Sequence, residues 1–223
     1  YYSNYYLIVN ALNIIIGQIF AGITASVGNL GASGNKERLY EVYCIGLFIN
    51  AFIYYGCTVI LWFLIDDFIS IWLGMEYIMN KNIVLIILAN FHINGMRRIT
   101  MVYRDSLGLY WYDRHKPVIE ASINLVVSII LANTFGLIGV FIGTFISLIT
   151  TSFWVEPYVL YKHGFNVKLK KYFYKYIKYV LIGALGFLSI LFLNDLIHFK
   201  LTFFTLILKG ILFLILFTFI FII

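Results

Sequence analysis

The sequence predicts an all-α integral membrane protein, a bundle of about seven transmembrane helices. Hydrophobic residues make up 62% of the 223 positions and charged residues only 12%, and the mean hydropathy is +0.94. A soluble domain usually contains about 25% charged residues. Apolar runs such as Val42–Ile65 and Leu201–Ile223 are long enough to cross a hydrocarbon core, which takes about 20 helical residues. Their periodicity is helical and lacks the strict alternation of a membrane β-strand.

Seven runs along the chain supply the expected helices. The second, sixth and seventh are largely apolar throughout, whereas polar residues such as Asn90 and Arg97 interrupt the third. Pro117 suits the first turn of the fourth helix, where its missing N–H group costs nothing. The short connector Asn133–Gly136 joins the fourth helix to the fifth. The expected spans are residues 4–27, 42–65, 79–103, 117–133, 135–158, 177–197 and 201–223.

Basic residues alternate between the connectors of this predicted bundle. If the chain starts outside, thirteen of the sixteen Lys and Arg residues lie in inner connectors or at inner helix ends. The outer connectors hold Lys81 and Lys200, and Lys209 lies within the last span. Because cytoplasmic loops carry an excess of Lys and Arg, the last helix is predicted to end in the cytoplasm. The basic run Lys162–Tyr179 then touches anionic head groups as an interfacial segment, or it only anchors the topology.

Polar residues inside the predicted spans are the candidate functional residues, because such groups are costly in a membrane. The first span carries one stripe at intervals of three or four residues: Asn10, Asn13, Gly17, Ala21, Thr24 and Gly28. Small residues let helices approach closely, whereas the two asparagines suit a wet cavity. Both readings of this stripe stay open.

The third span carries a second polar stripe, in which Asn90, Asn94, Arg97 and Arg104 recur at three- or four-residue steps and Arg98 lies beside it. A guanidinium group stays charged and offers a planar fork of donors that suits phosphate oxygens. The alternative is that Arg97 and Arg98 only snorkel to the inner interface. His92 falls on another side of the helix and is interpreted as a partnered core histidine.

Glu120 lies near the start of the fourth span and is followed at four-residue intervals by Asn124 and Ser128. A negative charge near a helix N-terminus is favourable in itself. We expect Glu120 to pair with an arginine from a neighbouring loop, with a role as ligand of a coupling ion as the alternative.

Signals for catalysis are missing from the sequence. It contains no metalloprotease motif, nucleophile elbow, P-loop or metal-spaced set of Cys and His. Cys44 and Cys57 are thirteen positions apart on one predicted helix, about 20 Å, which is too far for a disulfide. The chain is therefore predicted not to be an enzyme and to need no cofactor or metal, and its two cysteines are expected to be free.

Several segments together resemble the polysaccharide flippases of the multidrug/oligosaccharidyl-lipid/polysaccharide exporter superfamily, which are relatives of the MATE transporters. The matching segments are "YSNYYLIVNALNIII" at Tyr2–Ile16, "ASVGNLGA" at Ala25–Ala32, the long stretch Gly95–Ser147 that begins "GMRRITMVYRDSLGLYWYDRHKP", and "WVEPYVLYKHGF" at Trp154–Phe165. They cover about three quarters of the chain in the expected order. The last two predicted spans match only in hydropathy.

The resemblance implies the C-terminal half of a larger two-lobed, fourteen-helix transporter. Residues 1–165 would belong to its C-terminal lobe, and residues 166–223 would form a basic interfacial segment plus two additional C-terminal helices. Such proteins flip a lipid-linked oligosaccharide, bound to undecaprenyl pyrophosphate, from the inner to the outer leaflet of the bacterial plasma membrane. The expected partners are this substrate, membrane lipids, the missing N-terminal lobe and a polysaccharide polymerase, with no nucleic acid.

The resemblance also implies roles for the polar residues. The pyrophosphate on the cytoplasmic side would bind Arg97, Arg98 and Arg104. Sugar hydroxyls would contact Asn10, Asn13, Asn90 and Asn94. Three alternatives stay open: a cation-coupled small-molecule exporter of the MATE type, for which Glu120 would be the acidic group, a membrane enzyme that acts on lipid-linked sugars, and a scaffolding subunit.

Overall fold

The structure is a computed structural model that describes residues 2–197 and 200–222, and in this part of the chain every regular element is helical. The α-helices are α1 (Tyr2–Ala21), α2 (Thr24–Ala32), α3 (Lys36–Trp72), α4 (Lys81–Met96), α5 (Arg98–Ser106), α6 (Lys116–Phe135), α7 (Leu137–Thr150), α8 (Ser152–Val159), α9 (Lys170–Leu196) and α10 (Phe203–Ile222). The shorter helical turns are η1 (Met75–Tyr77), η2 (Leu109–Asp113) and the π-helical η3 (Leu160–Phe165). The prediction of an all-α protein is confirmed.

Within residues 2–197 and 200–222, six helical segments are long and apolar enough to cross a membrane. They are α1 with α2, α3, α6, α7 continued through α8 and η3, α9, and α10. These six segments coincide with six of the predicted spans, and they make the chain a multi-pass membrane protein by length and composition. Cys44 and Cys57 are both free, as predicted.

The helix predicted over residues 79–103 is interrupted. α4 has 16 residues and ends at Met96, and α5 begins at Arg98. Buried Asn50 of α3 lies beside this break, where its side-chain amide donates to the carbonyls of Gly95 at 3.2 Å and Met96 at 3.3 Å. Backbone carbonyls freed by a helix break need such partners in an apolar environment. Asn50 therefore stabilises the break.

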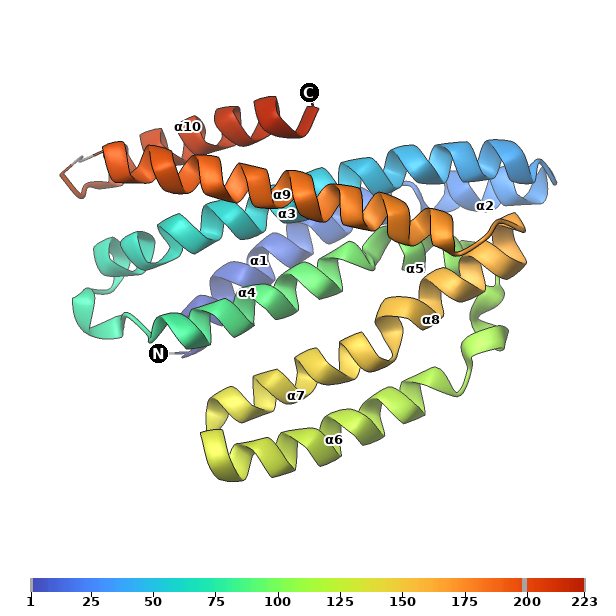
Figure 1. Ribbon diagram of the computed structural model, residues 1–223, viewed down its shortest axis with the longest axis horizontal. Helices are drawn as coiled ribbons and strands as arrows, with labels where there is room; N and C mark the ends of the chain where they lie inside the picture. Colours follow the sequence, from blue (N-terminus) through green and yellow to red (C-terminus); the bar gives the residue numbers. More distant parts are fainter. Residues whose placement is uncertain (1, 198–199, 223) are drawn as a thin grey trace.

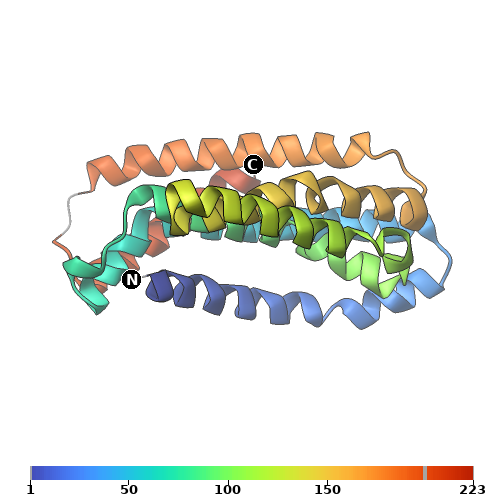
Figure 2. The same cartoon turned by 90° about the horizontal axis from the view of Figure 1, so that it is seen from below.

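The long helix α3 runs through the centre of the bundle and packs against α4, α5, α9 and α10 (Figure 1). α9 lies along one outer edge of the bundle and α1 along the opposite edge (Figure 2). Much of the core is aromatic: the Tyr43 ring lies 5.1 Å from that of Tyr103 and 4.9 Å from that of Phe165 between ring centroids, and all three are buried. The hairpin of α6 and α7 packs on this body through α4 (Figure 1).

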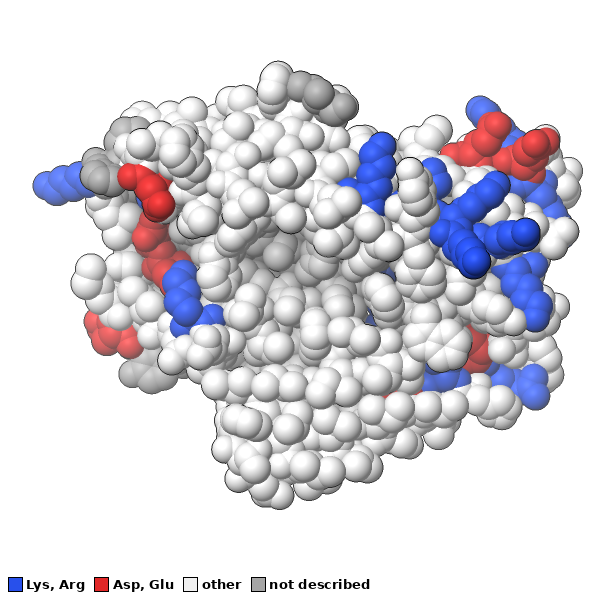
Figure 3. Space-filling model, in the orientation of Figure 1, with Lys and Arg blue, Asp and Glu red and all other residues white. Residues whose placement is uncertain are grey.

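On the face shown in Figure 3, charged side chains gather towards the two ends of the molecule and leave a largely uncharged region between them. The basic end is the one at which α3 and α9 begin, and it carries most of the Lys and Arg side chains. The opposite end, at which α3 and α9 finish, carries Asp66, Asp67 and Glu76. Large hydrophobic side chains are exposed between the two ends, as expected of a surface that faces lipid.

The basic run Lys162–Tyr179 does not form a single helix. Its first part belongs to the turn η3, which ends at Phe165, and Asn166 then adopts a left-handed conformation with φ of 58°. From Lys170 onward the run forms the first turns of α9. The helix therefore extends into the segment that the sequence analysis placed before the sixth span.

Candidate functional site

Five of the predicted substrate-binding residues line one cavity of about 460 Å³ between α1, α4, α5 and α7. This asparagine cavity, as it is called below, is lined by Asn10, Asn13, Asn90, Asn94 and Arg98, together with aromatic side chains that include Tyr2, Tyr6 and Phe141. The structure thus brings together the two polar stripes that the sequence analysis placed on the first and third spans.

The two asparagines on α4 are held in place by backbone groups, and the Asn94 side-chain oxygen also accepts a hydrogen bond from Nη1 of Arg97 at 3.3 Å. The Asn90 amide donates to the carbonyls of Ile86 and Phe141, each at 3.0 Å, and thereby ties α4 to α7. Its buried side-chain oxygen has no hydrogen-bond partner among the described residues. The Asn94 amide donates to the Asn90 carbonyl at 3.0 Å. These bonds fix the α4 wall of the cavity and leave one buried acceptor unsatisfied.

The two asparagines on α1 are uncommitted. In the described part of the chain, the side chains of Asn10 and Asn13 make no hydrogen bond to another protein group. Each amide keeps two donors and an acceptor available. The cavity therefore offers polar groups from both α1 and α4.

Arg98 supplies the positive charge of the asparagine cavity. Its guanidinium lies against α1 at Gly17, where a Cβ atom would meet it at 3.5 Å. Its polar neighbour is the neutral hydroxyl of Tyr54. Within residues 2–197 and 200–222, no carboxylate lies within 4.0 Å of Arg98. Arg98 is thus a half-buried cation without a counter-ion.

The other two predicted phosphate-binding arginines lie elsewhere, in an ion-pair network at the basic end. This network consists of Arg97, Arg104, Lys116, Asp113, Glu120 and Glu156. Most of these residues also line a second cavity, of about 620 Å³. The three cations of the network face its three carboxylates and also Asp105, which contacts Arg104, so the network has no excess positive charge.

Glu156 is the centre of the ion-pair network and is fully buried. Its carboxylate accepts hydrogen bonds from Nε of Arg97 at 2.9 Å and from Nη2 of the same residue at 2.6 Å, in a two-bond fork. The Lys116 ammonium also donates to Glu156, and to the Ser152 hydroxyl at 3.0 Å. Pro117, at the start of α6, sets the position of Lys116 in the first turn.

Glu120 and Arg104 occupy the edges of the network. Glu120 accepts a hydrogen bond from the Ser152 hydroxyl, and lies 4.0 Å from Arg97 and 3.8 Å from Lys116. It is therefore paired with an arginine, Arg97, which lies in the turn between α4 and α5, and also with Lys116 in the first turn of α6. Arg104 binds Asp113 at 2.7 Å and Asp105 at 2.8 Å. Burial alone would lower the pKa of Arg104, but its hydrogen bond to Asp105 and the surrounding carboxylates raise it.

The three predicted arginines therefore do not share one binding surface. Arg97 and Arg104 are neutralised by carboxylates, and Arg98 lines the asparagine cavity. The sequence analysis missed Glu156 as the common partner of Arg97 and Lys116. The available signal was Glu156 itself, a lone carboxylate followed by Pro157 inside an apolar run.

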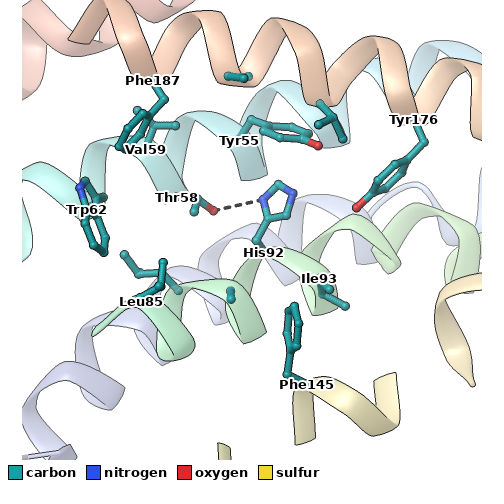
Figure 4. Close-up of a pocket in the computed structure, with 15 residues that line it drawn as sticks. Tyr55, Thr58, Val59, Trp62, Leu85, His92, Ile93, Phe145, Tyr176 and Phe187 are labelled. Carbon is teal, nitrogen blue, oxygen red and sulfur yellow. Dashed lines mark hydrogen bonds between the residues drawn. The ribbon is translucent and has the colours of Figure 1, made fainter. Parts of the chain in front are cut away.

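His92 belongs to neither polar cavity. Its Nδ1 atom lies 3.3 Å from the Thr58 hydroxyl oxygen, and its ring packs edge-on against Tyr55 at 4.3 Å between centroids (Figure 4). It lines an apolar cavity of about 510 Å³ between α3, α4, α7 and α9. This agrees with the prediction of a partnered core histidine. In the described residues no group of His, Cys, Asp and Glu side chains could hold a metal ion.

Comparisons of the chain with protein-family models, curated protein sequences and solved structures find no match. The geometry of the two polar cavities is therefore the basis on which a function for this chain is argued.

Proposed function

We propose that this chain takes part in flipping a lipid-linked oligosaccharide, bound to undecaprenyl pyrophosphate, from the cytoplasmic to the outer leaflet of the bacterial plasma membrane. The observation that carries the proposal is the asparagine cavity. It combines four amides with the unpaired guanidinium of Arg98 among apolar helices. Uncompensated charge inside a membrane is costly and usually marks a functional site.

The chemistry of the asparagine cavity suits a phosphorylated sugar. The Arg98 guanidinium can donate two parallel hydrogen bonds to a phosphate group. The free amides of Asn10 and Asn13 can both donate to and accept from sugar hydroxyls. The rings of Tyr2 and Tyr6 offer flat apolar surfaces to the C–H faces of a sugar. An apolar small molecule would leave these polar groups without partners, which is unfavourable.

The membrane arrangement in this proposal has seven spans. α4 and α5 together form the third, over residues 79–103, and the remaining spans are the six long apolar segments. The basic end faces the cytoplasm because inner loops collect Lys and Arg. The last helix then ends on the cytoplasmic side. In this arrangement the chain is the C-terminal half of a MATE-like flippase, and its partners are the N-terminal lobe and a polysaccharide polymerase.

The ion-pair network has a different role in the proposal. Because Arg97 and Arg104 are held by carboxylates, phosphate recognition is assigned to Arg98 alone. The network joins α5, α6 and α8 at the basic end, next to the asparagine cavity. It supports the shape of that cavity without adding positive charge to it.

The test is replacement of Arg98 in a strain that lacks the chromosomal gene and carries the full gene on a plasmid. Arg98→Gln should lower surface-polysaccharide export at least about tenfold, since a hydrogen bond to a charged group contributes about 1.5–3 kcal/mol. Lipid-linked repeat units should accumulate on the cytoplasmic face. Arg98→Lys should restore export in part, because it keeps the charge and loses the planar fork.

Arg38→Gln is the matched control. It removes one cation at the same end of the molecule, from an exposed pair with Glu41 at 3.0 Å, and should leave export unchanged. The amount of each variant in the membrane is measured in parallel. If Arg98→Gln exports as much polysaccharide as Arg38→Gln at equal protein amount, the assignment of Arg98 to the substrate is wrong.

The cation-coupled exporter is the second candidate, and Glu120 is the residue that favours it. Its carboxylate lies beside the hydroxyls of Thr151, at 3.3 Å, and Ser152. The positive groups of Arg97 and Lys116 lie within 4.0 Å, however, and compete with any bound cation. The flippase is therefore the better supported of the two.

A further inference from the structure

We infer that the first turns of α9 form a binding site for the head group of an anionic phospholipid, separate from the asparagine cavity. The site is a pocket of about 540 Å³ between α3 and α9. This lysine pocket, as it is called below, is lined by Lys170, Lys171, Lys175 and Lys178 with Tyr40 and Tyr174.

The charge of the lysine pocket is uncompensated. Within the part of the chain that the structure describes, none of its four lysines lies within 4.0 Å of a carboxylate. The N-terminus of α9 adds the partial positive charge of the helix dipole. The pocket therefore attracts an anion, and its several donors suit phosphate oxygens.

Aromatic side chains give the pocket its walls. The Lys171 ammonium lies 5.9 Å from the centroid of the Tyr40 ring, which links the first turn of α9 to the first turns of α3. Tyr174 is 76% exposed beside the lysines. Tyrosine is enriched at membrane interfaces, where its ring contacts apolar chains and its hydroxyl stays hydrated. This setting places the pocket at the level of lipid head groups.

An apolar stripe continues from the lysine pocket along the same face of α9. Lys178 is followed at steps of three or four residues by Leu181, Leu185, Leu188 and Phe192, which are 58–69% exposed. The stripe runs about 21 Å from Lys178 at about 1.5 Å per residue. One leaflet of a hydrocarbon core about 30 Å thick measures about 15 Å, so an acyl chain fits along the stripe.

The stripe is the reason for assigning a lipid and not a soluble anion. A free phosphate would use the lysines and leave the leucines without a role, whereas a phospholipid would contact both. α9 lies along an outer edge of the bundle (Figure 2), where bilayer lipids reach it without entering the core. The Lys and Arg side chains at the end where α9 begins form part of the basic surface in Figure 3.

The test measures lipid binding to the intact purified protein by native mass spectrometry. The probes are phosphatidylglycerol, phosphatidylcholine with the same acyl chains, and inorganic phosphate. Phosphatidylglycerol should bind the unmodified protein more tightly than phosphatidylcholine. Lys175→Gln with Lys178→Gln should weaken its binding by about 10- to 25-fold, because each lysine near an anionic surface contributes about fivefold. Replacing both lysines by arginine should preserve binding.

The control is Lys162→Gln with Lys200→Gln, which removes the same charge outside the lysine pocket. Lys162 donates to the Tyr158 hydroxyl at 2.7 Å instead, and this variant should bind phosphatidylglycerol as before. Unchanged binding in the Lys175/Lys178 variant, or equal binding of both lipids, would overturn the inference. Competition by millimolar inorganic phosphate would also overturn it. Because no transport is measured, these outcomes are independent of the proposed flippase activity.

Discussion

Replacement of Glu156 tests the ion-pair network most directly. Glu156→Gln keeps the size of the side chain but removes the charge that Arg97 and Lys116 share. The side chains of these two cations are only 11% and 9% exposed, so water cannot take over from the lost carboxylate. The variant should therefore be strongly destabilised.

The magnitude follows from the burial and the distances. Breaking a buried ion pair by removing one partner costs about 3–5 kcal/mol. Glu120 is near both cations, at 4.0 Å and 3.8 Å, and compensates in part. We therefore expect a loss of about 3 kcal/mol in the free energy of unfolding, near the lower end of the range for a broken buried pair. At about 2–4 °C per kcal/mol for a chain of this size, the thermal midpoint should fall by about 6–12 °C.

The assay is thermal unfolding of the purified protein in detergent, followed by the reaction of Cys44 and Cys57 with a fluorogenic thiol reagent. Glu41→Gln is the control, because its exposed pair with Arg38 should contribute less than about 1 kcal/mol.

A double-mutant cycle combines Glu156→Gln with Lys116→Met. Lys116→Met removes one of the cations that Glu156→Gln leaves unpaired, so the double variant should lose at least about 1 kcal/mol less than the sum of the single losses. The reasoning is refuted if the two losses simply add, or if Glu156→Gln lowers the midpoint no more than Glu41→Gln.

Two further predictions use the same thermal assay. Gly95→Ala should lower the free energy of unfolding by about 1–3 kcal/mol, because its Cβ would overlap the buried ring of Tyr54. Gly210→Ala meets only ordinary contacts and should raise it by up to about 1 kcal/mol, and a comparable loss at both glycines would contradict the packing argument. Lys209 is 15% exposed and lies 3.6 Å from Asp67, which is 32% exposed. Asp67→Asn should therefore cost about 1 kcal/mol more than Lys209→Met, since it leaves the more buried charge unpaired, and equal midpoints would argue against the pair.

The helices were predictable because their signal is local. An apolar run of about 20 residues is long enough to cross a membrane, where it must be helical so that its backbone groups bond to one another. The break between Met96 and Arg98 was not predictable in this way. It depends on Asn50, which lies more than 40 positions earlier in the chain and reaches the freed carbonyls only in the folded bundle.

The candidate site was predictable in part for the same reason. Spacing on a helix placed Asn10 with Asn13 and Asn90 with Asn94, and the fold then brought both pairs to one cavity. Lys209 shows the limit, because the sequence places it within the last span but does not reveal its pairing with Asp67 at 3.6 Å. A partner that lies far away along the chain leaves no periodic pattern from which it could be inferred.

The contrast between Arg97 and Arg98 affects how transport defects should be interpreted. Neighbouring residues at a helix start point in directions about 100° apart, as follows from 3.6 residues per turn. Arg97 therefore reaches Glu156 on α8, while Arg98 lines the cavity against α1. Loss of Arg97 leaves a buried carboxylate with fewer partners and should reduce the amount of folded protein. Loss of Arg98 removes a charge that had no counter-ion, so the fold should persist while phosphate binding is lost. A fall in export after mutation of Arg97 thus says nothing about substrate recognition unless the amount of folded protein is unchanged.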